Sequence, residues 1–157
     1  KATWVDAELI RVKSAESQLK GFIRIPVEIY SLDIIGYSLQ ENLKMDGWQS
    51  LKSYRLATIR GYVGLAKMLK QHNLAHIKTT SLGQALKMVK NGRVDVVVLL
   101  TGMLNRQSND SADVMLYENK LGSITLYHYI HQKHQNMVPK LTEVLARLVK
   151  QNTVKDK

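Results

Sequence analysis

The sequence has 157 residues, a formal net charge of +10 and no cysteine. This length fits one ordinary domain or two small lobes, and it excludes a large multidomain enzyme. Without cysteine the chain has no disulfide framework, no thiolate zinc site and no cysteine nucleophile. No apolar run approaches the roughly 20 residues that a helix needs to cross a bilayer.

The positive charge is concentrated in the middle of the chain, where residues 40–93 carry ten basic and two acidic side chains. Four of these lysines stand singly between apolar residues, as on the solvent-exposed face of amphipathic helices: Lys67, Lys70, Lys87 and Lys90. No basic run is interleaved with stacking aromatic residues, so we expect no nucleic-acid partner. A surface that binds another polyanion is an alternative, which a steep salt dependence of binding would indicate.

The first predicted elements are two extended runs. Residues 22–27, FIRIPV, predict a short strand that stops at Pro26, because proline lacks the backbone donor that an interior strand position needs. Residues 33–39 form the second run, and the Asp46-Gly47 pair after it predicts a turn. We therefore expect two separate strands before the first clear turn.

Strands and helices alternate most clearly between residues 55 and 100. Strands are predicted at 55–60, 76–79 and 94–100, and helices at about 63–73 and 81–91. Ser81 and Gln84 form a capping box at the start of the second helix, and Gly92 ends it. The run at 94–100 shows no alternation, so both of its faces should be buried under helices. Two successive strand–helix–strand units indicate an α/β lobe.

The remainder of the chain is less regular. A short helix is predicted at 102–109, a strand at 113–117 and a clearer strand at 123–130. An amphipathic helix is predicted at about 136–151, where apolar residues repeat at helical spacing and Pro139 fits the first turn. The chain should therefore close with a strand and then a helix.

Three stretches together resemble a known family: RLATIRGYVG, SLGQALKMVKNGRVDVVVL and LYHYIHQKHQNMVPKLTEVLARL. They are similar to the second half of bacterial extracellular solute-binding proteins of family 3, the amino-acid type of periplasmic binding protein. The resemblance implies an α/β fold with one complete lobe, residues 39–124, joined by two hinge strands to a partial lobe one. Residues 1–38 and 125–157 would form that partial lobe, which lacks its first part.

The resemblance implies a periplasmic solute-binding or sensory domain that clamps a small anionic molecule between two lobes, without catalysis, cofactor or metal. The helix start after strand 55–60 would meet the anion, since free N–H groups and the helix dipole favour negative charge. The expected ligand-binding residues are Arg60, Gly61, Tyr62 and Thr101. In that family an aspartate five residues beyond the position of Asp95 meets the ligand ammonium, but here Leu100 occupies the position and cannot neutralise a cation.

The expected partners are a small-molecule ligand and either an ABC-transporter permease or a membrane sensor. A partial lobe leaves a sheet edge uncovered, which predicts a homodimer formed by strand exchange through the first 35 residues. The alternative function is the effector-sensing domain of a LysR-type transcription regulator, which shares the two-lobed architecture and works in the cytoplasm.

Two further groups of residues were candidates for chemistry. Asp95 follows a helix end and enters a buried strand, where a carboxylate can accept hydrogen bonds from turn amides, so we expect a structural role. His128, His131 and His134 could ligate zinc or nickel, but no Asp, Glu or Cys adjacent in sequence completes a tetrahedral site. No G-x-S-x-G elbow and no P-loop is present, so we expect no enzyme activity.

Overall fold

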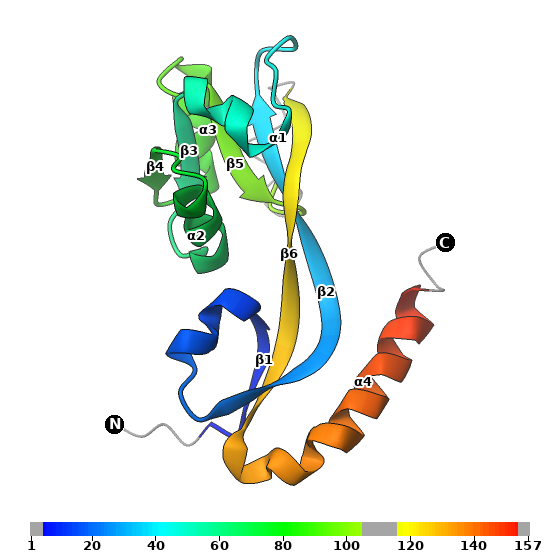
Figure 1. Ribbon diagram of the computed structural model, residues 1–157. Coiled ribbons are helices and arrows are strands. Elements are labelled where there is room, and N and C mark those ends of the chain that lie inside the picture. The colour runs from blue at the N-terminus through cyan, green and yellow to red at the C-terminus, as the bar shows by residue number, and fades with distance from the viewer. Residues whose placement is uncertain (1–4, 105–115, 154–157) are drawn as a thin grey trace. The chain divides into compact units, whose positions relative to one another are not determined.

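The computed structural model of the chain describes residues 5–104 and 116–153 (Figure 1). The chain divides into two compact units: unit 1 is Lys1–Ser31 with Thr125–Lys157, and unit 2 is Leu32–Ile124. Both divisions fall inside long strands, β2 (Phe22–Ser38) and β6 (Tyr117–His131). The chain therefore passes from one unit to the other twice, each time along a strand.

Unit 2 is an α/β unit with the strand order β6-β2-β5-β3-β4. Strand β3 (Leu56–Ile59) pairs in parallel with both β4 (His76–Thr79) and β5 (Val96–Leu100). Helix α2 (Val63–Gln71) connects β3 to β4, and helix α3 (Leu82–Lys90) connects β4 to β5. The two predicted strand–helix–strand units are therefore confirmed.

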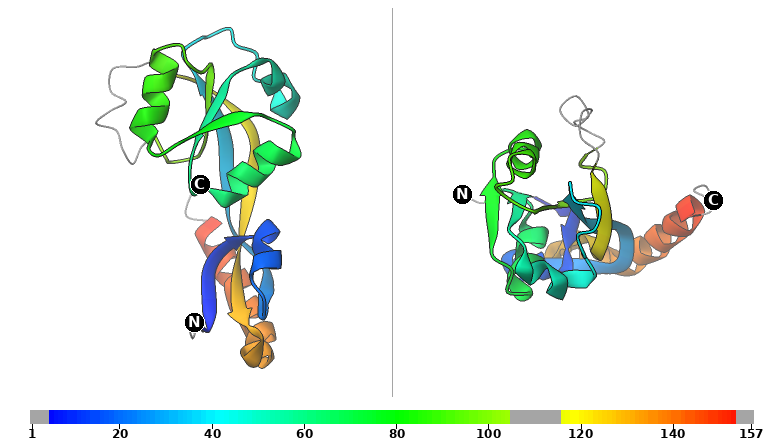
Figure 2. Two further views of the ribbon diagram at one scale, coloured as in Figure 1. Left: turned by 90° about the vertical axis from the view of Figure 1, so that its left-hand side faces the viewer. Right: turned by 90° about the horizontal axis from the view of Figure 1, so that it is seen from above.

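The two helices of unit 2 cover opposite faces of its sheet (Figure 2). Because β4 and β5 lie on opposite sides of β3, two right-handed connections must place α2 and α3 on different faces. Strand β5 is consequently covered on both sides, and every one of its residues is buried. This explains why its sequence shows no alternation of polar and apolar residues.

The hydrophobic core belongs almost entirely to unit 2. Of the 25 buried hydrophobic side chains among the described residues, 22 lie in unit 2 and three, Ile25, Tyr129 and Ile130, lie in unit 1. One cluster packs Ala85 and Leu86 of α3 against Leu99 of β5. Full burial of a leucine or valine side chain stabilises the fold by about 1.5–3 kcal/mol before the loss of chain entropy is counted.

The start of α3 follows the capping chemistry that the sequence predicts. Ser81 Oγ accepts a hydrogen bond from the backbone N–H of Gln84 at 3.2 Å. The reciprocal bond is shifted by one residue, because Gln84 Oε1 accepts from the N–H of Thr80, at 2.8 Å, and not from that of Ser81. The N-cap is therefore confirmed, and the capping box spans one residue more than expected.

The two strands expected at 22–27 and 33–39 are wrong as separate elements, because β2 is continuous from Phe22 to Ser38. Pro26 lies inside the strand with an exposed side chain. Its missing N–H is tolerated because the pairing with β5 begins only at Ile34, so the outer edge of β2 needs no donor near Pro26. Local signals predict a stop at proline, but strand pairing decides whether the stop occurs.

Unit 1 contains β1 (Ala7–Val12), the 3₁₀ segments η1 (Lys13–Gln18) and η4 (Gln132–Met137), the outer part of β2 and the end of β6. Strand β1 pairs antiparallel with β6, and the register shifts between Glu8 and Arg11. Helix α4 (Val138–Thr153) confirms the amphipathic helix predicted near the C-terminus. Its described side chains are half-buried or exposed, and none is fully buried.

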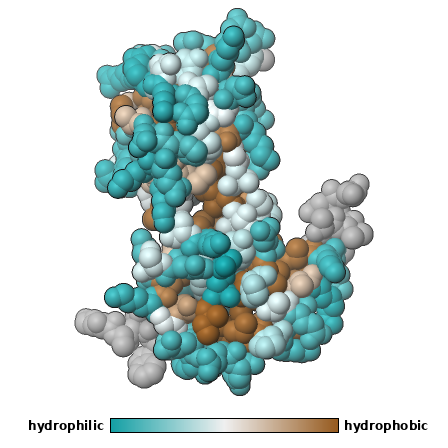
Figure 3. Space-filling model, viewed as in Figure 1, coloured by the Kyte–Doolittle hydropathy of each residue, from teal (hydrophilic) through white to brown (hydrophobic). Residues whose placement is uncertain are grey.

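Unit 1 carries most of the exposed hydrophobic surface. Among the described residues nine large hydrophobic side chains are exposed, and six of them lie in unit 1: Val5, Leu9, Ile10, Tyr30, Met137 and Leu148. Figure 3 shows hydrophobic surface over unit 1, whereas the helices of unit 2 present mainly hydrophilic side chains in the same view. An apolar surface of this kind commonly marks an interaction site.

The smaller elements complete unit 2. Helix α1 (Gly47–Ser50) and the 3₁₀ turn η2 (Leu51–Ser53) follow β2. The Trp48 indole stacks on the His72 imidazole, with ring centroids 4.7 Å apart and planes 6° apart. The helix expected at 102–109 begins as a turn through residue 104, and its remainder, like most of the strand expected at 113–117, lies outside the described residues. None of the described helices is long and apolar enough to cross a membrane.

Candidate functional site

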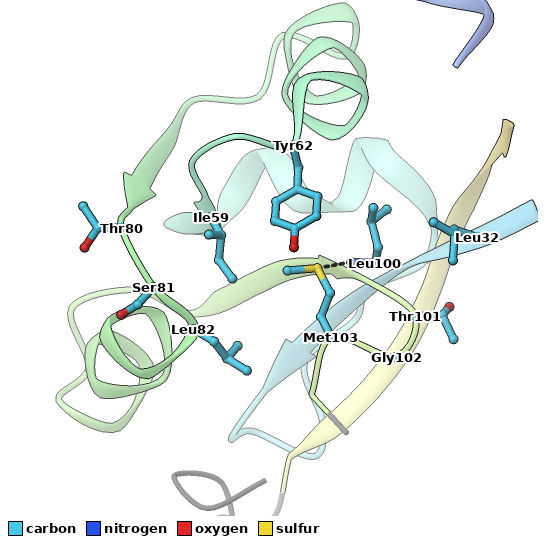
Figure 4. Close-up of a pocket in the computed structure, with 10 residues that line it drawn as sticks. All are labelled: Leu32, Ile59, Tyr62, Thr80, Ser81, Leu82, Leu100, Thr101, Gly102 and Met103. Atoms are coloured by element: carbon cyan, nitrogen blue, oxygen red, sulfur yellow. Dashed lines mark hydrogen bonds between the residues drawn. The ribbon is translucent and has the colours of Figure 1, made fainter. Parts of the chain in front are cut away.

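Unit 2 has a pocket of about 320 Å³ at the carboxyl ends of β3, β4 and β5 (Figure 4). Five of the residues that line it are apolar: Leu32, Ile59, Leu82, Leu100 and Met103. Four carry a hydroxyl group: Tyr62, Thr80, Ser81 and Thr101. Gly102 completes the lining, so none of these residues carries a charge.

The fold itself creates this pocket. In a parallel arrangement the carboxyl ends of neighbouring strands share one edge of the sheet, and a crevice opens where the connections leave in opposite directions. Ile59 is the last residue of β3 and Leu100 the last of β5, whereas Thr80 and Ser81 connect β4 to α3. The lining therefore comes from three strand ends that are distant in sequence.

Two helices begin at the pocket, and their first turns differ. The Ser81 hydroxyl caps α3, but Tyr62, the N-cap residue of α2, makes no capping hydrogen bond with its side chain. The first N–H groups of any helix have no acceptor within the helix. The N–H of Val63 donates to the Gly61 carbonyl at 3.1 Å, so the backbone donors left without a side-chain cap at the start of α2 are those after Val63.

The hydroxyl groups of the pocket differ in what they can still bind. Thr80 donates to Gln84 Oε1 at 3.0 Å, and Thr101 donates to the Asp33 carbonyl at 3.1 Å, so each retains only its acceptor capacity. Ser81 Oγ already accepts from Gln84 N–H and can still donate. The Tyr62 hydroxyl points toward Leu100 and Met103 (Figure 4), and among the described residues it has no protein partner.

The structure places the four residues predicted from the sequence in two groups. Tyr62 and Thr101 line the pocket on different sides. Arg60 and Gly61 are not among its lining residues. The Arg60 side chain is exposed, and the backbone N–H of Arg60 donates to Thr79 O at 2.8 Å. Gly61 turns the chain with φ +100°. Thr80 was not predicted at the pocket, and Ser81 was predicted only as a helix cap, although a pair of hydroxyl residues after a predicted strand is a usable signal.

Asp95 has the structural role expected of it, through a different partner. Its Oδ2 accepts from the backbone N–H of Arg55 at 2.7 Å and from Arg55 Nε at 3.0 Å, and its Oδ1 accepts from Arg55 Nη2 at 2.7 Å. The hydrogen bond from the guanidinium lowers the pKa of Asp95 below its usual value of 3.8. The carboxylate therefore ties the entrance of β5 to the start of β3, and it does not line the pocket.

The three histidines spaced at intervals of three residues do not converge. His128 Nδ1 is 3.0 Å from Leu9 O, His131 packs edge-on against Phe22, and His134 contacts the Asp6 carboxylate at 3.1 Å. In the described part of the chain no group of three or more His, Cys, Asp or Glu side chains is placed to hold a metal ion.

No protein-family model matches the sequence, and no curated protein shows significant similarity to it. Solved structures match in fold. A histidine kinase sensor domain with similarity to periplasmic binding proteins gives a TM-score of 0.66 at 15% identity, covering 97% of this chain and 67% of that chain. The probable amino-acid ABC transporter extracellular-binding protein ytmK from Bacillus subtilis gives a TM-score of 0.63 at 18% identity, covering 97% of this chain and 68% of that chain. Holo ArgBP from T. maritima gives a TM-score of 0.61 at 14% identity, covering 93% of this chain and 65% of that chain.

These similarities concern the fold. The predicted fold class, an α/β periplasmic-binding-protein-like fold with a partial lobe, is confirmed, and so is the resemblance in fold to amino-acid-type binding proteins. The chain spans about two thirds of the length of these structures. The matched proteins are named as binding proteins and as the sensor domain of a histidine kinase.

Proposed function

We propose that this protein is a periplasmic solute-binding or sensory domain that holds a small anionic molecule in the pocket of unit 2. The observation that carries the proposal is the pocket at the carboxyl ends of three parallel strands, next to a helix start without a side-chain cap. Its volume, about 320 Å³, is that of a small-molecule site. Binding proteins and a sensor domain share the fold, which supports binding without catalysis.

The contrast between the two helix starts supports an anionic ligand. The free N–H groups and the positive end of the dipole at the start of α2 suit an anion that completes its cap. The Tyr62 hydroxyl, directed into the pocket, can donate to the same anion. Helix α3 offers less, because Ser81 already satisfies one of its N–H groups. The net charge of +8 over residues 40–93 adds a favourable field.

We propose that the two units correspond to the two lobes expected from the sequence. Unit 2 would be the complete lobe and unit 1 the partial lobe. The partner would be an ABC-transporter permease or a membrane sensor, since the matched structures include an extracellular-binding protein of an ABC transporter and a sensor domain of a histidine kinase. The LysR-type regulator stays an untested alternative.

We also propose that a second copy of the chain covers unit 1 by strand exchange. Strand β1 is an edge strand, and the apolar side chains Leu9 and Ile10 on it are 73% and 38% exposed. Light scattering after size exclusion should give a dimer, and Leu9→Lys should shift it toward the monomer. A monomer at all accessible concentrations would contradict this proposal and leave the ligand site untouched.

The direct test of the ligand site is a thermal-shift screen of the whole chain against small carboxylates, phosphates, amino acids and uncharged sugars. A ligand present at 100 times its dissociation constant stabilises the folded state by about 2.7 kcal/mol, which such a screen detects. We expect anions among the hits, each then measured by calorimetric titration. A screen in which only uncharged sugars stabilise the protein would contradict the anion site.

Val63 offers a matched pair of variants at the start of α2. Its side chain is 58% exposed, so polar replacements should be tolerated. Val63→Asp should stabilise the helix by about 0.3–1 kcal/mol while repelling the ligand, and Val63→Asn provides the neutral control. We expect the affinity for the anionic hit to fall by about tenfold or more in the aspartate variant alone. Equal affinities of the two variants would place the anion elsewhere.

Arg60 stays a predicted ligand residue. Its side chain is exposed and does not line the pocket, so its contribution should be electrostatic. Arg60→Ala should lower the affinity for the anionic hit by about twofold to fivefold, which is the range expected of exposed charge pairs. An unchanged dissociation constant would remove Arg60 from the site.

A further inference from the structure

We propose, building on the anion site above, that unit 2 selects small carboxylates with an aliphatic body and rejects those that carry an ammonium group. Leu100 is the specificity-determining residue in this proposal.

The centre of the pocket is apolar. Leu100 ends β5 with 9% relative exposure, and Met103 lies beside it, its sulfur 3.3 Å from the Leu100 N–H (Figure 4). Ile59 and Leu82 lie across the pocket from Leu100 in the same view. A ligand seated among these side chains gains from burying an aliphatic group there.

None of the acidic side chains described in unit 2 lines this pocket. Asp33 is paired with Lys120 at 2.8 Å, and Asp95 is paired with Arg55 at 2.7 Å. Glu118 lies against the Tyr37 hydroxyl, whose pKa is raised chiefly by burial and also by this carboxylate. The two remaining carboxylates, Glu41 and Asp46, are exposed and outside the lining. A cation in the pocket would therefore have no counter-charge from the described residues of this unit.

The hydroxyl groups do not replace a counter-charge. Thr80 and Thr101 can each accept one hydrogen bond from a ligand, but they stand on different sides of the pocket (Figure 4). An ammonium group brings three donors and a full charge, and its removal from water needs a charged partner. Two neutral acceptors on different sides of the pocket are better suited to a ligand hydroxyl group than to an ammonium group.

The experiment compares acids that differ only in the ammonium group. Pentanoate and 4-methylpentanoate are titrated into the whole chain beside norvaline and leucine, which have the same carbon skeletons with an α-ammonium. We expect each carboxylate to bind at least about tenfold tighter than its amino acid, because the unpaired charge is desolvated. Equal or tighter binding of the amino acids would overturn the inference while leaving an anion site in place.

Leu100 is tested with a charged variant and its neutral isostere. Leu100→Asp supplies a counter-charge and should reverse the preference in favour of leucine, whereas Leu100→Asn has the same shape and should not. Leu32→Asp, at a more exposed position of the same wall, provides a second test if Leu100→Asp does not fold. An unchanged preference in a folded aspartate variant would remove Leu100 from its assigned role.

Failure of the inference and failure of the proposed function give different results. Binding of inorganic phosphate or of the amino acids, weakened by Val63→Asp, with no binding of the aliphatic carboxylates, would overturn the inference alone. Absence of binding by every anion tested would overturn both. Tighter binding of the carboxylates, together with sensitivity to Val63→Asp and to Leu100→Asp, supports both.

Discussion

Unit 2 and unit 1 differ in how completely they bury their hydrophobic side chains. Unit 2 encloses a core from both faces of its sheet, and it holds 22 of the 25 buried hydrophobic side chains that the described residues contribute. Unit 1 has three, and six of the nine exposed large hydrophobic side chains described belong to it. The pocket lies in the unit whose packing is complete.

The two units are therefore suited to different kinds of contact. Binding sites work best on elements whose side chains are held by packing. The strand ends of unit 2 meet this condition because β5 is buried on both faces. The apolar surface of unit 1 is instead suited to contact with another polypeptide.

The largest effect is expected from a large-to-small substitution in the core of unit 2. Leu99 has 0% relative exposure, whereas Leu148 of unit 1 has 45%. Leu99→Ala should lower the free energy of unfolding by about 2–5 kcal/mol, because it removes buried methyl groups and leaves a cavity. Leu148→Ala should cost less than about 1 kcal/mol. Urea denaturation of both variants measures the contrast, and equal losses would break the comparison between the units.

The next effect concerns two carboxylates with cationic partners. The Asp95 side chain is 19% exposed and accepts from Arg55, whereas Asp6 of unit 1, paired with Lys133 and His134, is 64% exposed. Asp95→Asn should destabilise the protein by about 1–2 kcal/mol at neutral pH. Asp6→Asn should destabilise the protein less, because solvent screens the exposed ion pairs of Asp6.

The pH dependence of stability tests the same ion pair of Asp95 with Arg55. Since the folded-state pKa of Asp95 lies below 3.8, its contribution is complete above that pH and is lost as the pH falls through the folded value. The stability difference between wild type and Asp95→Asn should therefore shrink below about pH 4. A difference that does not change with pH would contradict the assigned ion pair.

A smaller effect is expected at the start of α3. Ser81→Ala removes the hydroxyl that accepts from Gln84 N–H, which should cost about 1 kcal/mol. Ser81→Asp, which can restore the cap, should recover most of this loss. Thermal unfolding of the three proteins measures the effect, and equal stability of wild type and Ser81→Ala would show that the cap contributes nothing.

The smallest effect at accessible pH should come from Tyr129 in unit 1. Burial, and after it the nearby Glu16 carboxylate, raises the pKa of Tyr129 from 10 to about 12. Its contribution to stability is therefore complete below pH 10 and is lost as the pH rises toward 12. Tyr129→Phe should flatten this alkaline loss. An unchanged alkaline profile in that variant would contradict the burial of the phenol.

The sequence was sufficient where the signals are local. Ser81, Gly92 and the apolar run that follows predict the start of α3, its end and the buried strand β5, because capping and glycine geometry act within a few residues. The same signals failed at Pro26, where the pairing of β2 with distant strands overrides the local preference.

The site was predicted only in part for the same reason. Tyr62 could be expected at the pocket because a helix start after a strand faces the crevice of such a sheet. Leu32 could not, since its position depends on the register that pairs Ile34 with Leu100, 66 residues away. Which hydroxyl groups remain free also depends on contacts such as that of Thr101 with Asp33.

The stacked pair formed by Trp48 and His72 allows the unfolding of unit 2 to be followed by tryptophan fluorescence. The indole also lies close to Gly122, where an added Cβ would be 3.3 Å from its Nε1, so the ring reports on α1, the end of α2 and β6 together. The sequence has two tryptophans, and Trp4→Phe leaves Trp48 as the sole indole emitter. Its emission then follows the melting of one unit, while circular dichroism at the peptide band follows the whole chain.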